Sequence, residues 1–167
     1  EEIQKSIEVL RSGMLAQGPN VARFEKEFAA FCGTRHGISV NSGTAALHAA
    51  LACAGIHAGD EVIVPTFSFF ATASCVSMCG ATPVFVDVDP KTFNIDPACV
   101  AEAITPKTRA VIGVHLFGQP FDLRPVLEIC EDHKLALVED AAQAHGAQYK
   151  GKNVGGFGKA GCFSFYP

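Results

Sequence analysis

The sequence lacks several features that mark whole classes of protein. It has no basic excess, with 13 Lys and Arg against 17 Asp and Glu, which argues against a nucleic-acid-binding groove. No apolar run reaches about 18 residues, so we expect no membrane span. The most apolar stretch, residues 62–86, is interrupted by Pro65, Gly80 and Pro83. No charged and then apolar leader opens the chain, so secretion is unsupported and we expect a cytoplasmic protein.

Metal-binding patterns are also missing. No CxxC pair and no HxxxH pair occurs, and the odd count of seven cysteines indicates reduced, mostly buried thiols. Cys75 and Cys79 share a helix face at i, i+4, but a soft-metal site would need two further ligands. We therefore predict no metal site.

The length of 167 residues, 49% of them hydrophobic, fits one domain that buries about 70% of its unfolded surface. The chain begins at Glu1 rather than Met, and Pro167 follows a strand-like run directly. We therefore expect both ends to be cut, and the chain to be part of a longer protein.

The apolar periodicity alternates between helix-like and strand-like segments. Helices are expected over residues 3–12, 21–32, 44–54, 71–79, from 97 onward and 122–133. Glycine or an Asp-Pro pair marks the boundary of several of them. Strands are expected over residues 37–40, 61–64, 83–88, 109–114, 135–138 and 161–165. Strands separated by helices predict parallel crossovers, and near-continuous apolar strands predict helices on both faces. The expected fold class is α/β, as a three-layer α/β/α arrangement with a mainly parallel sheet.

Ligands of open parallel sheets bind outside the carboxyl ends of the strands, and residues 41–46 form one candidate segment there. Gly43 allows close backbone approach, the start of the following helix attracts an anion, and the Thr44 hydroxyl adds a donor. The alternative is that Ser42 or Gly43 merely caps the helix.

A second segment, residues 138–145, places Glu139 and Asp140 at the end of a buried strand. Because side chains alternate along a strand, only one of the two can face a given side. A carboxylate there could accept a charge-assisted hydrogen bond from a protonated ring nitrogen. The alternative is an Asp that caps the following turn.

A third segment, residues 65–72, carries three aromatic side chains past a strand end. Phe67 and Phe70 are expected to face the core, whereas Phe69 could stack on a planar ligand; core packing is the alternative for all three. Other phosphate-binding patterns are weak, because no GxGxxG follows an expected strand and no GxxxxGK[ST] occurs. The glycine-rich residues 151–159 have the wrong spacing and are interpreted as a mobile turn.

Together these segments resemble the DegT-type sugar aminotransferases (DegT/DnrJ/EryC/StrS), which are fold-type I enzymes that use pyridoxal phosphate. The motifs that carry the resemblance are NSGTAAL at 41–47, EDAAQAHG at 139–146, GCFSFYP at 161–167, QGP at 17–19, RFE at 23–25 and HLFGQP at 115–120. The resemblance spans essentially the whole chain. It implies that residues 1–167 are the N-terminal part of a cofactor-binding large domain whose smaller C-terminal domain is absent.

The resemblance also assigns roles. Gly43 and Thr44, helped by Ser164, would hold the cofactor phosphate, and Phe69 takes the ring-stacking position. Asp140 would pair with the pyridine nitrogen, and Gln143 would sit at the ring hydroxyl. A carboxylate that keeps the ring nitrogen protonated makes the cofactor a stronger electron sink.

The activity that the resemblance implies is transfer of an amino group, commonly from glutamate, to a keto group of a sugar that is usually nucleotide-linked. The essential Schiff-base lysine is expected two residues after Pro167, so no catalytic residue lies within this chain and the fragment alone is expected to be inactive. The complete enzyme is expected to be a homodimer. A sugar dehydratase with histidine at the lysine position, and a non-catalytic binding protein built on the same cradle, stay as alternatives.

Overall fold

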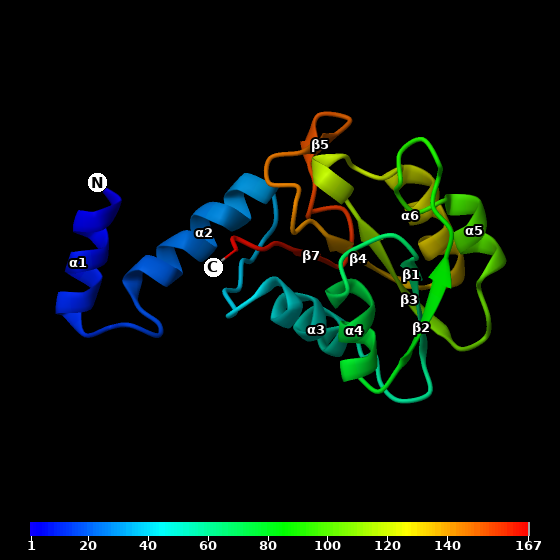
Figure 1. The fold of residues 1–167 in the computed structure, drawn as a ribbon, viewed down its shortest axis with the longest axis horizontal. Helices are drawn as coiled ribbons and strands as arrows, with labels where there is room; N and C mark the ends of the chain where they lie inside the picture. The colour runs from blue at the N-terminus through cyan, green and yellow to red at the C-terminus, as the bar shows by residue number, and fades with distance from the viewer. Residues whose placement is uncertain (167) are drawn as a thin grey trace. The chain divides into compact units, whose positions relative to one another are not determined.

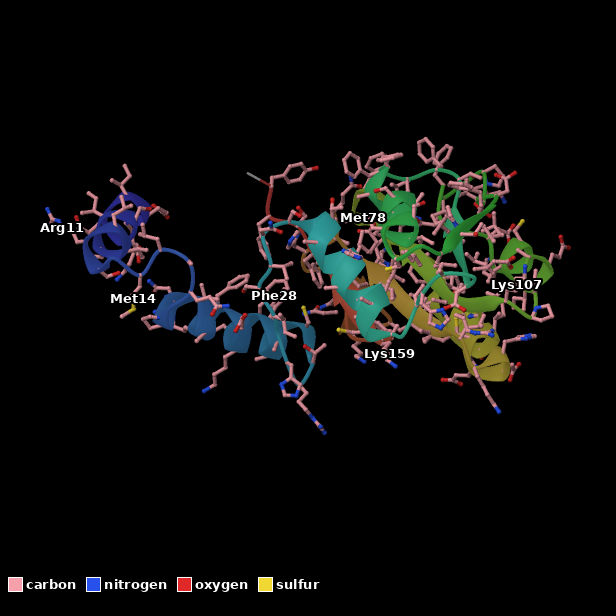
Figure 2. All side chains as sticks on the ribbon, turned by 90° about the horizontal axis from the view of Figure 1, so that it is seen from below. Arg11, Met14, Phe28, Met78, Lys107 and Lys159 are labelled. Carbon is pink, nitrogen blue, oxygen red and sulfur yellow. The ribbon has the colours of Figure 1, made fainter. Side chains whose placement is uncertain are left out.

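The computed structural model describes residues 1–166, and the chain divides into two compact units, Glu1–Ser39 and Val40–Pro167. The first unit holds helices α1 (Glu2–Ser12) and α2 (Pro19–Cys32). Both end at a glycine in the left-handed conformation, Gly13 with φ 72° and Gly33 with φ 70°, as the sequence predicts. Figure 2 marks Arg11 at the end of α1, Met14 in the turn after it, and Phe28 on α2.

The strand expected over residues 37–40 is wrong. This segment runs outside any strand, and Ser39 N–H donates to Glu25 Oε1 of α2 at 2.7 Å instead. A Cβ on Gly37 would lie 2.5 Å from the Glu25 carbonyl oxygen, so only glycine fits against the helix there. An alternating apolar pattern becomes a strand only where a neighbouring strand takes up its hydrogen bonds.

The second unit is built on a parallel sheet. Within the described residues the sheet has five strands in the order β2-β1-β3-β4-β7, and every neighbouring pair is parallel. Their bounds are β1 Glu61–Pro65, β2 Thr82–Val86, β3 Thr108–Val114, β4 Ala136–Asp140 and β7 Ala160–Cys162. At the carboxyl edge, Val114 pairs with Asp140 and Asp140 pairs with Cys162. The sequence places each of these strands within a few residues.

Helices cover both faces of this sheet, which confirms the expected three-layer α/β/α arrangement (Figure 1). Helices α3 (Gly43–Cys53) and α4 (Ala71–Met78) pack on one face against Val62, Val64 and Ile112. Helices α5 (Pro97–Glu102) and α6 (Leu123–His133) pack on the other face against Ile63 and Val111. The strand residues therefore alternate between two fully buried clusters, as the continuous apolar runs indicate.

Two helix starts test the expected capping residues. Asp96 caps α5, because its carboxylate accepts from Ala98 N–H at 2.8 Å. Asp122 occupies the same position before α6 but makes no such bond. Its carboxylate accepts from the Tyr149 hydroxyl at 2.6 Å instead, which joins α6 to the short strand β5 (Gln148–Tyr149).

The glycine-rich residues 151–159 are not a featureless turn. They continue from the antiparallel pair of β5 with β6 (Lys152–Asn153) into a loop that ends at β7. Three N–H groups of this loop donate to one buried carboxylate, Glu139, so the interpretation as a mobile turn is wrong. Among the described residues, no helix is long and apolar enough to cross a membrane.

Candidate functional site

One cavity of about 200 Å³ lies at the carboxyl edge of the sheet, and all six candidate residues that the sequence indicates line it. They come from four separate segments, and the six are Gly43, Thr44, Phe69, Asp140, Gln143 and Ser164. This is the position at which ligands of open parallel sheets bind. Whether these residues hold a cofactor stays a prediction; the structure establishes that they share one site.

Asp140 forms the buried base of this cavity. Its side chain is 5% exposed, and its two oxygens accept from the Thr72 hydroxyl at 2.9 Å and from Ala142 N–H at 3.2 Å. Burial raises the pKa of Asp140 above its ordinary value, and these two hydrogen bonds offset only part of the effect. Each carboxylate oxygen has a second lone pair, so Asp140 can accept one more donor, and a cationic donor would offset the cost of its burial.

The adjacent acid, Glu139, serves the opposite face of the sheet. Its carboxylate is fully buried and accepts from His115 Nε2 at 3.1 Å and from the N–H groups of Gly155, Phe157 and Gly158 at 2.7–2.8 Å. The alternation expected for the two acids is therefore correct: one lines the cavity and the other fixes a loop.

The start of α3 forms one wall. Ser42 caps the helix, because its hydroxyl accepts from Ala45 N–H at 3.1 Å. Ser42 also lines the cavity, so the capping role and a place in the site are both correct. The N–H groups of Gly43 and Thr44 belong to the first turn, before the intrahelical ladder begins, and suit an anion. A Cβ on Gly43 would lie 2.9 Å from the Cβ of Ser164, so glycine is needed here to let the chain after β7 approach.

The aromatic segment after β1 differs from the expectation. Phe67 and Phe70 do not face the core, since they are 49% and 79% exposed. Phe69 is 73% exposed and lines the cavity, so its ring is available to a ligand. The core positions of this segment belong to Ala71 and Thr72, at the start of α4.

Gln143 has one end of its amide already engaged. Its Oε1 accepts from Phe117 N–H at 2.9 Å, which leaves the Nε2 end as the donor. Phe117 has a left-handed backbone with φ 54°, and Asn94 holds the same turn through Leu116 N–H and the Gln119 carbonyl. Strain of this kind persists where surrounding contacts enforce it.

Sequence reasoning missed three polar contributors to the site. Ser68 and Tyr166 line the cavity, and the buried Thr72 hydroxyl donates a hydrogen bond to Asp140. Ser68 and Thr72 both lie in the aromatic segment, residues 65–72. Only the tertiary pairing of α4 with β4 could have identified Thr72, because 68 residues separate it from Asp140.

A larger cavity of about 480 Å³ lies at the opposite edge of the sheet, between Ala54, Arg109 and Lys159. Its arginine is engaged with Asp60 at 3.7 Å and with backbone carbonyls, and Glu131, Lys134 and Lys159 also line it. Within residues 1–166, no group of three or more His, Cys, Asp or Glu residues could hold a metal ion.

The carboxyl-edge cavity combines an anion-binding helix start, an exposed aromatic ring and a buried carboxylate. These three features fit a planar ligand that carries an anionic group at one end and a cationic ring nitrogen at the other.

Comparison with known proteins identifies relatives by sequence and by fold. Residues 1–167 match the DegT/DnrJ/EryC1/StrS aminotransferase family. The chain is 51% identical over 149 residues to GDP-perosamine synthase from Caulobacter vibrioides, which covers 89% of this chain and 40% of that protein. It is 49% identical over 159 residues to the dTDP-3-amino-3,4,6-trideoxy-alpha-D-glucose transaminase of Streptomyces venezuelae, covering 95% and 42%.

A solved structure gives the same result. Spr1654 from Streptococcus pneumoniae, in its PLP form, superposes with a TM-score of 0.95 at 33% identity, over 99% of this chain and 45% of that one. The chain thus spans less than half the length of the relatives it matches.

Proposed function

This chain belongs to the DegT/DnrJ/EryC1/StrS aminotransferase family, and from that membership we propose that the protein containing it transfers an amino group from an amino acid to a keto sugar. Glutamate is the proposed donor, and the acceptor is proposed to be nucleotide-linked. The curated relatives named above are a GDP-perosamine synthase and a dTDP-amino-sugar transaminase, which supports a sugar nucleotide.

One observation carries the proposal. The cavity places the first turn of α3 and the buried Asp140 in one enclosure, with Phe69 on its wall. The first turn of α3 suits a phosphate, and the buried Asp140 suits a protonated pyridine nitrogen. Pyridoxal 5'-phosphate carries both groups on one planar ring, so the residues present fit it.

The residues of this chain would bind and orient that cofactor. Gly43, Thr44 and Ser164 would hold its phosphate, and Phe69 would cover one face of its ring. Bound there, the cofactor supplies an electron sink for a carbanion. Asp140 would keep a proton on the ring nitrogen, and Gln143 would donate through Nε2 to the ring oxygen, because its Oε1 already accepts from Phe117 N–H.

An Asp140→Ala change tests this assignment in the complete protein. We expect amino transfer to fall by about 100-fold or more, since the cationic ring would lose its buried partner. Asp122→Ala is the matched control, because Asp122 is exposed and does not line the cavity. Equal turnover in the two variants would exclude Asp140 from the reaction.

The Schiff-base lysine is proposed to follow Pro167 by two residues. Sequencing the coding region beyond Pro167 tests this directly. A lysine there supports amino transfer, whereas a histidine would redirect the proposal to sugar dehydration. A stop codon at that point would leave a cofactor-binding chain without its base and would contradict the enzymatic proposal.

The complete enzyme is proposed to be a cytoplasmic homodimer. Support comes from the seven cysteines, all of them free, which suit a reducing compartment. Phe69, Phe70 and Phe117 are each more than 70% exposed, which suits a surface that a second subunit covers. Sedimentation equilibrium of the complete protein checks the dimer, and a monomeric mass would contradict it.

A further inference from the structure

Thr72 supports Asp140 from inside the protein. Its side chain is 1% exposed, and its hydroxyl donates to Asp140 Oδ2 at 2.9 Å from helix α4. A buried hydroxyl destabilises a fold unless it is hydrogen-bonded, and a bond to a charged acceptor is about twice as strong as one to a neutral group. This bond joins α4 to β4, whereas the Thr72 backbone bonds locally: its N–H donates to the Phe69 carbonyl and its carbonyl accepts from the Cys75 thiol.

Thr72 also shares a hydrogen bond with Ser68, and the direction of that bond follows from the first. Ser68 Oγ lies 2.8 Å from Thr72 Oγ1. A hydroxyl has one proton, so Thr72, which donates to Asp140, must accept from Ser68. The chain of donors therefore runs from Ser68 to Thr72 to Asp140. Ser68, which lines the cavity, then has only lone pairs left to offer a ligand.

We propose that Thr72 is a positioning residue, which orients the Asp140 carboxylate and lowers its proton affinity so that the proton stays on the cofactor's ring nitrogen. This inference rests on the proposed function, in which Asp140 pairs with that nitrogen. Between the ring nitrogen and Asp140 there is one proton to share. A hydrogen bond donated to Oδ2 stabilises the charged carboxylate, so its removal shifts the proton from nitrogen toward oxygen.

Two substitutions at position 72 separate the hydroxyl from the space that the side chain fills. Thr72→Val keeps the shape and removes the hydroxyl, whereas Thr72→Ser keeps the hydroxyl and removes the methyl group. If the hydroxyl positions Asp140, Thr72→Val is the damaging change and Thr72→Ser restores the wild-type behaviour. If Thr72 only fills space, the order reverses and the proposal is overturned.

The measurement uses the complete protein loaded with pyridoxal 5'-phosphate that carries ¹⁵N in its ring. The ¹⁵N chemical shift reports protonation of the ring nitrogen, and a titration gives the cofactor dissociation constant. For Thr72→Val we expect a shift toward the unprotonated position and a dissociation constant about 10-fold higher. For Thr72→Ser we expect the wild-type shift and a dissociation constant within about 2-fold of wild type.

An Asp140→Asn variant distinguishes failure of this inference from failure of the proposed function. If Asp140→Asn leaves the ¹⁵N shift unchanged, Asp140 does not pair with the ring and the proposed function loses its main support. If Asp140→Asn moves the shift and Thr72→Val does not, only the role of Thr72 is wrong.

Ser68→Ala keeps the inference falsifiable if Thr72→Val fails to fold, which thermal unfolding of each apo variant will reveal. Ser68 is only half-buried, so its removal leaves the core intact. Without its donor, Thr72 is a weaker donor to Asp140, and the ¹⁵N shift should move in the same direction by less. An unchanged shift in Ser68→Ala, in the absence of a folded Thr72→Val variant, would overturn the proposal.

Discussion

His115 Nε2 lies 3.1 Å from Oε2 of Glu139, and neither side chain has accessible surface. The imidazole also stacks on Phe121, with ring centroids 4.7 Å apart and planes 15° from parallel. The same carboxylate accepts from three N–H groups of residues 155–158. One buried acid at the end of β4 thus joins the residue that follows β3 and the loop before β7.

Replacing this acid tests how much the junction stabilises the fold. Glu139→Gln places an amide NH₂ among donors, so we expect the free energy of unfolding at pH 7 to fall by about 3 kcal/mol. Glu128→Gln is the control: Glu128 is exposed and pairs with Arg124 on the surface, so its loss should be below about 1 kcal/mol. Denaturant unfolding gives both values, and equal losses would contradict a structural role for Glu139.

The pH dependence of the same variant follows from the pKa of Glu139. Burial raises that pKa, but the hydrogen bonds from His115 and from three N–H groups lower it by more, so it lies below its ordinary value of 4.5. A lowered carboxyl pKa contributes stability that is present in full above the unfolded value and is lost as pH falls through the folded value. The difference between wild type and Glu139→Gln should therefore be constant above about pH 5.5 and shrink in more acidic solution. A difference that grows with acid would contradict this.

Gly43 tests the contact between α3 and the chain after β7. Gly43→Ala would set two Cβ atoms 2.9 Å apart, so the Ser164 segment must move away from the helix start. We expect weaker cofactor binding by about 10-fold and a lower unfolding free energy. Adding Ser164→Gly should recover the stability but not the affinity, because the Ser164 hydroxyl is also gone. Additive effects on stability would contradict the contact.

Phe69 and Phe70 form a matched pair for the stacking role. Both rings are more than 70% exposed, but only Phe69 lines the cavity. Phe69→Ala should raise the dissociation constant of pyridoxal 5'-phosphate by about 10-fold, and Phe69→Trp should preserve it. Phe70→Ala should leave the constant within about 2-fold of wild type. Equal effects of the two alanine variants in a fluorescence titration would exclude a specific role for Phe69.

Asn94 holds the turn at residues 116–119, and Phe117 in that turn donates its N–H to Gln143 of the cavity. The Asn94 side chain is 2% exposed, accepts from Leu116 N–H at 3.2 Å and donates to the Gln119 carbonyl at 2.9 Å. Asn94→Ala should loosen this turn, free the Gln143 amide to rotate and weaken cofactor binding by about 5-fold. In a Gln143→Ala background the same change should have no further effect on affinity. A double-mutant cycle measures this coupling, and simple additivity would exclude it.

The elements that the sequence predicts well are those with local signals. Helix ends at Gly13 and Gly33 depend on a single backbone conformation, and continuous apolar runs mark buried parallel strands wherever they lie. The strand expected at residues 37–40 fails because pairing depends on a neighbour that no local pattern specifies. Phe67 and Phe70 are exposed and not in the core for a related reason: the hydrophobicity of a side chain does not specify whether its position in the fold is buried.

The candidate site divides in the same way. The six residues named from motifs do share one cavity, because the motifs follow strand ends that a parallel sheet gathers at one edge. Thr72 and Asn94 could not be found in this manner. Each acts through a partner at least 22 residues away, and only the folded packing brings the pairs together.

The cavity depends on contacts between segments that are far apart in the chain. Its walls come from segments near Ser42 and near Tyr166, on either side of the strands of the sheet in the sequence. Parallel pairing between distant strands is slow, since chain entropy is lost before the contacts form. Both walls are complete only when Tyr166 is in place, so the anion-binding wall depends on residues from both ends of this unit. A ligand that binds the closed cavity and not the unfolded chain stabilises the native state by mass action.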